Sequence, residues 1–496
     1  MSQPQIVIIG AGFGGLAAAI DLKRSGIESF TILEQADEVG GVWQANHYPG
    51  AACDVPSITY QFSYALNGNW SRRYGTQAEI RDYMRDTAVR FGVRDHVRFG
   101  ATVTAMRWSE ETARWTVEVA GGETIEADIV IGATGQLSRP NLPDVPGRER
   151  FAGAQFHSAE WDDAVQLDGK RVVVVGGGAT AIQVVPALAG RVSHLTVVQR
   201  TPSWVVNKYD WAPTFIERLP FLQRAYHNLI WLWFESRYPA VLRRSRPIRA
   251  AWEAQRKRAM RRILRDPQKV AAVTPDYQMG CNRILLSREW YPTLAREDVD
   301  VRREGVAELN EAGLVTTAGE QVDADVIVWC TGFTATEYLA PIEITGRGGQ
   351  SIREAWADGP EAYLGISTPG FPNLFMVYGP NTNSLTNTIV YLLERQAAYI
   401  RQAVEYLTAR GGAIEVREEV HEAFNAELER RFQKTTFTTG CPGWYTTASG
   451  KVVSPWVGSH VEYGRRTRVF DPGVFEHRTV APVIAPGRPP AATTPR

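Results

Sequence analysis

Short runs of apolar, mostly β-branched residues recur along the chain and predict buried strands. Residues 5–9 form one such run, and a glycine-rich stretch and an alanine- and leucine-rich helix from Leu16 to about Arg24 follow it. A second apolar run at 30–33 completes a β-α-β unit of about 30 residues, a length that suits this motif. Because both runs are apolar throughout rather than alternating, they are typical of buried parallel strands.

The same arrangement occurs a second time in the middle of the chain. A β-branched strand at 171–175 runs into glycines that open a helix, and another strand covers 194–199. Between the two units, apolar and polar positions alternate over much of 97–131, which predicts an antiparallel meander that ends in a buried strand at 127–131. The two β-α-β units are the chain's only internal repeat.

The remaining pattern indicates how these units are organised into domains. Buried strands are expected at 323–329 and 374–377, and a long helix is expected from about Ile389, whereas 211–278 is helical, aromatic and basic. We therefore predict an α/β fold with two Rossmann-like dinucleotide-binding domains and a helical insertion. The first domain is expected to span 1–140 plus 374–496, the second 148–210 plus 279–373, and the insertion 211–278.

Composition and charge exclude several classes of function. Lys plus Arg and Asp plus Glu both total 54, so the formal net charge is zero, which argues against a dedicated nucleic-acid binder. The apolar stretch 6–20 lacks the basic flank of a signal peptide, and the aromatic run 230–234 is too short to cross a bilayer. We expect a globular cytoplasmic protein.

The cysteines carry no metal or redox motif. Cys53, Cys281, Cys330 and Cys441 are far apart and form no CxxC pair. We therefore expect no disulfide scaffold, no zinc ribbon or other metal site, and no dithiol redox pair.

The first glycine motif predicts a dinucleotide site. Gly10, Gly12 and Gly15 have the G-x-G-x-x-G spacing, with Gly14 inside it. The first glycine permits the tight turn, the second lets the backbone approach a pyrophosphate at the helix N-terminus, and the third lets helix and strand pack closely. Glu34 ends the second strand, where a carboxylate accepts hydrogen bonds from ribose hydroxyls.

The second motif predicts a site for a phosphorylated nicotinamide dinucleotide. Gly176, Gly178 and Ala181 have the same spacing, with Thr180 inside it. No acid stands at the end of the following strand; Arg200 and Thr201 stand there instead. A guanidinium pairs well with a 2′-phosphate and cannot accept from a hydroxyl, so we interpret this site as NADPH-binding.

Two dinucleotide sites in one chain indicate FAD at the first and NADPH at the second, with hydride passing between them. Disulfide reductases and monooxygenases both use this pair of cofactors. The reductases need a redox-active cysteine pair, which this sequence lacks.

Two further motifs resemble those of type I Baeyer–Villiger monooxygenases. Residues 151–162 read F-x-G-x-x-x-H-x-x-x-W-D, and residues 40–54 read G-G-x-W-x-x-x-x-Y-P-G-x-x-x-D. The first matches the family fingerprint at every defined position and lies just before the second glycine motif, as in the family. The resemblance runs from the first strand to about Tyr445.

The resemblance implies a reaction and two catalytic residues. NADPH would reduce FAD, O2 would form a C4a-peroxyflavin, and this would insert one oxygen beside a ketone carbonyl to give an ester or lactone. Arg283 occupies the position of the family's arginine that stabilises the peroxide anion, and Asp54 is its natural partner. The family often has Lys before this arginine, whereas this chain has Asn282, so one cationic contact to NADPH is lost.

The resemblance also implies weaker assignments. His157 would couple domain rotation to NADPH binding rather than carry a proton, and a structural histidine is the alternative. The remaining positions would contact cofactor, with core packing as the alternative for the aromatic ones: Trp43 and Tyr60 beside the flavin, the Val103 backbone at the adenine part of FAD, Asn387 and Thr388 near the isoalloxazine, and Trp444 near NADP and substrate.

Three alternatives remain open from the sequence. The chemistry also suits a flavin-dependent oxygenase of sulfides or amines, and two nucleotide sites also suit a non-catalytic NADP(H)-sensing protein. The basic insertion 211–278 forms either a helical subdomain with a solvated arginine face or a contact with an anionic membrane surface. Its aromatic content favours a bulky apolar ketone as the substrate.

Overall fold

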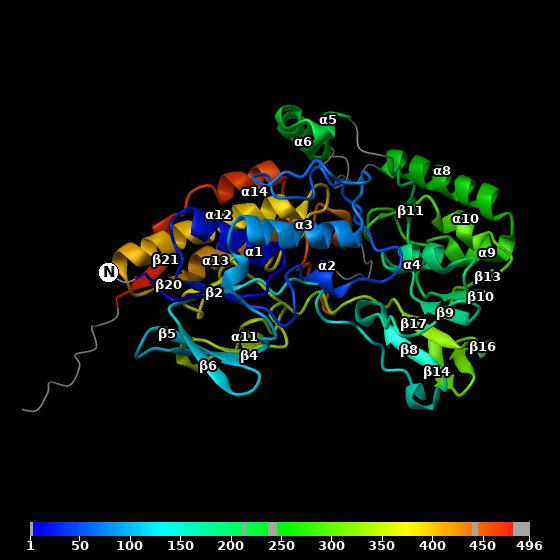
Figure 1. Ribbon diagram of the computed structural model, residues 1–496, viewed down its shortest axis with the longest axis horizontal. Coiled ribbons are helices and arrows are strands. Elements are labelled where there is room, and N and C mark those ends of the chain that lie inside the picture. Colours follow the sequence, from blue (N-terminus) through cyan, green and yellow to red (C-terminus); the bar gives the residue numbers. More distant parts are fainter. Residues whose placement is uncertain (1–2, 212–214, 237–245, 439–444, 480–496) are drawn as a thin grey trace, which may run out of the picture.

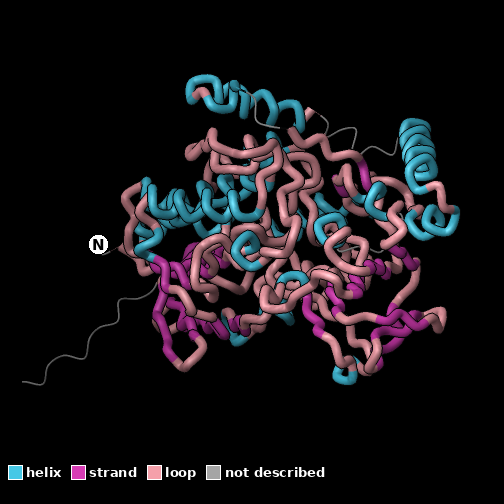
Figure 2. Tube along the Cα trace, turned by 45° about the vertical axis from the view of Figure 1, so that its right-hand side comes forward, coloured by secondary structure: helices cyan, strands magenta, loops and turns pink. Residues whose placement is uncertain are grey.

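The computed structural model describes the chain apart from residues 1–2, 212–214, 237–245, 439–444 and 480–496 (Figure 1). Two groups of strands lie apart in the lower half of the molecule, and most helices lie above them (Figure 2). Each group of strands is the sheet system of one nucleotide-binding domain.

The first domain is built on a five-stranded parallel sheet in the order β19-β7-β1-β2-β3. Its strands are β1 (Ile6–Ile9), β2 (Phe30–Leu33), β3 (Val97–Arg98), β7 (Ile129–Gly132) and β19 (Leu374–Met376). Helix α1 (Phe13–Arg24) follows β1 and packs against the long α12 (Ile389–Arg410). The apolar run predicted for 30–33 and the helix predicted from Ile389 are confirmed.

The second domain repeats this design with the parallel order β13-β10-β9-β17-β8. Its strands are β8 (Ala154–His157), β9 (Arg171–Val175), β10 (His194–Val198), β13 (Val299–Arg302) and β17 (Val326–Trp329). Helix α4 (Ala181–Leu188) follows β9 as α1 follows β1. The expected second β-α-β unit is therefore confirmed.

The predicted meander is confirmed, and it gains a fourth strand from far along the chain. Strands β4 (Val103–Ser109), β5 (Arg114–Val119) and β6 (Glu123–Ala127) are antiparallel, and β18 (Glu343–Thr345) pairs parallel with β4. Leu339, Ile342 and Ile344 are buried in the core of the first domain. We therefore propose that the chain returns to the first domain near residue 339, in place of the boundary at 374.

The helices of 211–278 form two separate pieces rather than one subdomain. Helices α5 (Phe215–Arg218) and α6 (Pro220–Glu235) lie at the top of the molecule beside α14 (His460–Arg466), whereas α8 (Arg246–Leu264) lies above the second domain (Figure 1). Met260 and Leu264 of α8 and Val273 of α9 (Pro267–Val273) are buried in the core of the second domain. Sequence pattern could not separate the two pieces because both are helical.

Shorter elements connect this framework. They are helices α2 (Val42–Ala45), α3 (Gln77–Arg90), α10 (Trp290–Leu294), α11 (Ile352–Ala355) and α13 (Glu418–Phe432), and strands β11 (Val205–Val206), β12 (Leu285–Leu286), β14 (Val306–Asn310), β15 (Gly313–Thr316), β16 (Gln321–Asp323), β20 (Ala413–Val416) and β21 (Phe475–Arg478).

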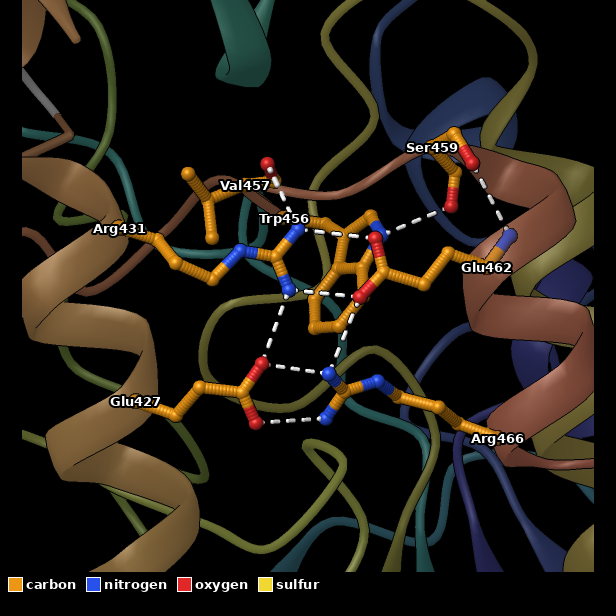
Figure 3. Close-up of polar contacts among 7 residues, drawn as sticks. All are labelled: Glu427, Arg431, Trp456, Val457, Ser459, Glu462 and Arg466. Atoms are coloured by element: carbon orange, nitrogen blue, oxygen red, sulfur yellow. Dashed lines mark hydrogen bonds and ion pairs between the residues drawn. The ribbon is translucent and has the colours of Figure 1, made fainter. Parts of the chain in front are cut away.

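A ring of four charges joins α13 to α14 (Figure 3). Arg431 lies 2.6 Å from Glu462 and 3.2 Å from Glu427, and Arg466 bonds the same two carboxylates. Both guanidinium groups lie about 6 Å from the centroid of the Trp456 ring, within cation–π range. The backbone N–H of Trp456 donates to the carbonyl of Asn383 at 2.9 Å, so the ring of charges packs against a segment that is bonded to the loop before α12.

One cysteine forms a disulfide bond that the sequence analysis did not predict. Cys53 and Cys330 are free and buried, whereas Cys281 is disulfide-bonded. The wide spacing of the cysteines did not predict this bond, because spacing reports only local pairing motifs. Cys441 lies outside the described residues.

Candidate active site

In the first glycine loop, contacts within the protein require a glycine at three positions but not at the fourth. A Cβ at Gly10 would lie 2.7 Å from the Ala133 carbonyl oxygen, and a Cβ at Gly15 would overlap the carbonyl of Gly10. A Cβ at Gly14 would lie 3.0 Å from the Val377 side chain. At Gly12, by contrast, the nearest atom would be the Gly41 Cα at 3.5 Å, an ordinary contact. The protein alone tolerates a side chain at Gly12, so the space above it fits a ligand.

Two further features of this loop suit FAD. Helix α1 begins here with no side-chain cap and no acid in its first turn, so its N–H groups remain available to a phosphate. The buried Glu34 carboxylate accepts from the Ala11 N–H at 2.6 Å and from the Ala36 N–H at 2.9 Å. A carboxylate offers about four acceptor sites, so it retains capacity for ribose hydroxyls.

In the second glycine loop, contacts within the protein again require one glycine and leave space at another. A Cβ at Gly176 would overlap the Cys330 carbonyl, whereas a Cβ at Gly178 would have nothing within 4 Å. Thr180 is the N-cap of α4 but makes no side-chain cap bond, and Ala181, the first residue of this helix, is fully buried. Arg200 and Thr201 are exposed just after β10. These residues fit the phosphate groups of NADPH.

Arg283 and Asp54 form an ion pair between Nη2 and Oδ2 that joins the two domains. Asp54 lies in the loop between α2 and α3 of the first domain, and Arg283 lies just before β12, which pairs with β11 after the second nucleotide unit. Asp54 raises the pKa of Arg283 further above its ordinary value, so the guanidinium stays charged. The Arg283 side chain keeps 40 % of its surface exposed, which leaves it accessible to a ligand.

The pair has neighbours that the sequence did not indicate. Tyr378 and Tyr445 lie close enough to Arg283 to change its electrostatics, and burial raises the pKa of Tyr445 to about 12, so both remain neutral phenols. Lys208 donates from Nζ to the Cys53 carbonyl at 2.9 Å and lies 4.7 Å from the Tyr74 ring centroid. Lys208, from the second domain, thus bonds to the residue next to Asp54. No sequence motif indicated this role for Lys208.

Trp43 and Tyr60, which the resemblance places beside the flavin, lie together next to the first glycine loop. The Trp43 indole donates to the Tyr60 hydroxyl at 3.1 Å, and the Tyr60 ring meets Phe13 of α1 edge-on at 5.3 Å. Val103 is buried at the start of β4. Thr388 is the N-cap of α12, and its hydroxyl accepts from the Val390 N–H.

Other residues with a predicted cofactor role bond to the protein itself or lie outside the described residues. The Asn387 amide donates to the Trp231 carbonyl of α6 at 3.0 Å, and Trp444 lies outside the described residues. His157 is buried; its Nδ1 accepts from the Ala159 N–H, and burial lowers its pKa to about 4. It is therefore neutral near pH 7, which suits a structural or coupling residue rather than a proton carrier.

Sequence comparison places this site among known flavoproteins. A family model described as pyridine nucleotide-disulphide oxidoreductase matches residues 7–256. A Baeyer-Villiger monooxygenase of Streptomyces coelicolor is 40 % identical over 489 residues, which cover 97 % of this chain and 93 % of that protein. Another from Pseudomonas aeruginosa is 36 % identical over 495 residues, covering 97 % and 92 %.

Solved structures agree with the sequence comparison. A cyclohexanone monooxygenase from Rhodococcus sp. Phi1 bound to NADP+ superposes with a TM-score of 0.87 at 28 % identity, covering 96 % of this chain and 99 % of that one. An oxidized steroid monooxygenase bound to NADP superposes with a TM-score of 0.85 at 31 % identity, covering 94 % and 97 %.

These findings define the class first. Two Rossmann-like domains with glycine loops shaped for dinucleotides, together with the similarities above, identify an FAD- and NADPH-dependent flavoprotein monooxygenase. Within that class, the chain belongs to the Baeyer–Villiger monooxygenase family. The predicted fold class, family and cofactors are confirmed, and the heteroatom oxygenase is not favoured. The individual residue roles stay predictions.

Proposed function

We propose that this protein converts an apolar ketone to an ester or lactone, with Arg283 and Asp54 as its catalytic pair. The observation that carries the proposal is their ion pair, which lies where the two domains meet. FAD would lie on Gly10, Gly12 and Glu34, and NADPH on Gly178, Arg200 and the N-terminus of α4.

When bound, FAD takes a hydride from NADPH and activates O2 for transfer to the substrate. The chain's own contribution is electrostatic. The guanidinium of Arg283 stabilises negative charge that develops on oxygen during the reaction, and Asp54 orients it and balances its charge before substrate arrives. Tyr378 and Tyr445, which burial keeps neutral, lie near the guanidinium and add no negative charge beside it.

The direct test supplies NADPH, heavy-oxygen O2 and a panel of ketones, with one sulfide and one amine beside them. The proposal requires that label appears in an ester or lactone. A solved cyclohexanone monooxygenase with bound epsilon-caprolactone, 27 % identical to this chain, supports including cyclic ketones in the panel.

We also propose that the outer surface of α6 and α8 contacts an anionic membrane surface, through which an apolar ketone would arrive. The solvent side of α6 carries large apolar side chains: Phe221, Leu229 and Leu232 are 57–75 % exposed. The solvent side of α8 combines Trp252 with exposed arginines at 258, 261 and 262, and Arg265 is exposed directly after this helix. Both helices lie on the upper side of the molecule in Figures 1 and 2. Apolar and basic groups on one side complement acyl chains and anionic headgroups.

Among the described residues, no helix is long and apolar enough to cross a membrane, so this contact would be peripheral. We expect the protein to sediment with phosphatidylglycerol vesicles at low salt, and less with phosphatidylcholine vesicles or at high salt. The double variant L229E/L232E should lose this binding. Val469→Glu is the matched control, because Val469 is 67 % exposed but lies beyond α14, outside the two helices. Equal recovery with both lipids, or unchanged binding of the double variant, would contradict the contact.

A further inference from the structure

A buried chain of polar groups links the insertion helix α6 to the loop that precedes α12. Glu235 lies at the end of α6, His460 begins α14, and Ser384 lies in the loop. His460 Nδ1 lies 3.2 Å from Glu235 Oε2, and His460 Nε2 lies 2.9 Å from the Ser384 hydroxyl oxygen. The histidine is 2 % exposed and the glutamate side chain 10 %.

The hydrogen bonds of Ser384 show which atoms donate and which accept in this chain of polar groups. The Ser384 hydroxyl donates to the Asn387 carbonyl at 2.6 Å and accepts from the Asn387 N–H at 3.2 Å. Its single proton is therefore used, so the histidine Nε2 donates to it. Burial alone would raise the pKa of Glu235, but the His460 ring and the Val461 N–H lower it overall. His460 therefore faces a carboxylate oxygen with Nδ1 and the Ser384 hydroxyl with Nε2.

The loop that this chain holds continues toward the predicted flavin contacts. Asn387 bonds α6 a second time through the Trp231 carbonyl, and its Oδ1 accepts from the Thr388 N–H at 2.9 Å. At the other end of the loop, the Tyr378 hydroxyl, beside Arg283, donates to Asn383 at 3.0 Å. The loop therefore spans from Arg283 to the N-terminus of α12 and is fixed from outside by α6.

We propose that His460 is a positioning residue that, through Ser384 and with Glu235 packed beside its Nδ1, holds the 384–388 loop in its FAD-contacting form. The inference rests on the proposed function and on the expectation, implied by the family resemblance, that Thr388 contacts the flavin. It gives the insertion helix a role in the active site: α6 completes the support of the loop that closes on the flavin.

Ser384→Ala tests the inference most cleanly, because it removes the link to the loop and leaves the contact between Glu235 and His460 intact. We expect the FAD dissociation constant to rise about tenfold, since a buried hydrogen bond that supports the loop is lost. We also expect a shifted flavin absorption spectrum and more hydrogen peroxide per NADPH consumed. Ser384→Thr keeps the hydroxyl and should restore all three. Glu235→Gln should resemble Ser384→Ala.

The matched control is Ser459→Ala. Ser459 precedes His460 and caps α14 with its hydroxyl, which accepts from the Glu462 N–H rather than from His460 or Ser384. It should lower the melting temperature without changing the FAD dissociation constant or spectrum. If Ser384→Ala keeps the wild-type FAD dissociation constant and forms no extra hydrogen peroxide per NADPH, the positioning role of His460 is overturned while the proposed function stands. Wild-type protein that does not hold FAD would overturn the proposed function and, with it, this inference.

Discussion

Replacing Arg283 with alanine is expected to lower ester formation by about two to three orders of magnitude or more, while NADPH still reduces the flavin. The guanidinium carries the fixed positive charge of the site, and its partner Asp54 remains behind as an uncompensated carboxylate. Oxygen consumption should continue with hydrogen peroxide as the product. Anaerobic stopped-flow absorbance measures flavin reduction, and gas chromatography measures the ester.

Two further variants make this result specific. Asp54→Asn keeps the shape of the partner but removes its charge, so we expect a smaller loss than in Arg283→Ala. Arg288→Ala removes an exposed arginine beyond β12 on the same segment and should leave the ester yield unchanged. Ester formation near the wild-type rate in Arg283→Ala would remove Arg283 from the mechanism.

Gly12→Ala is expected to give a folded but colourless protein, with FAD affinity lowered about a hundredfold. The added methyl group meets the protein only at an ordinary 3.5 Å contact, so the apoprotein should fold. It would occupy the space through which a pyrophosphate reaches the N–H groups of α1, and losing two charge-assisted hydrogen bonds accounts for an effect of this size. Flavin absorbance and fluorescence titration with FAD measure it.

Gly178→Ala is the matched control in the second domain. Its Cβ would have no protein atom within 4 Å, so the protein should fold and stay yellow, but its KM for NADPH should rise. A Gly12→Ala protein that retains FAD, or a Gly178→Ala protein that loses it, would show that the two cofactors are assigned to the wrong loops.

The parts of the fold that the sequence predicted are those with local causes. Strand 171–175 and the start of α12 at Ile389 follow from continuous apolar runs and from a threonine cap. The glycine loops were recognisable because Gly10, Gly15 and Gly176 answer short-range steric demands within the protein, while Gly12 and Gly178 complete the spacing of the dinucleotide motif. The spacing of Glu34 after the first strand reflects the fixed length of one β-α-β unit.

The parts that sequence did not predict depend on contacts between distant segments. Strand β18 has only three residues and pairs with β4 more than 200 positions away, so no local pattern marks it. The division of 211–278 into two pieces depends on which domain each helix meets. Lys208 and His460 are single polar residues whose roles come from the Cys53 carbonyl and from Glu235, and neither belongs to a motif.

The measurement that tests the central claim most directly follows heavy oxygen from O2 into product. The FAD-loaded protein would receive NADPH and linear, cyclic and aromatic ketones together with one sulfide and one amine, and mass spectrometry would locate the label. We predict one labelled oxygen in an ester or lactone. Label found only on sulfur or nitrogen would contradict the assignment and make the protein a heteroatom oxygenase.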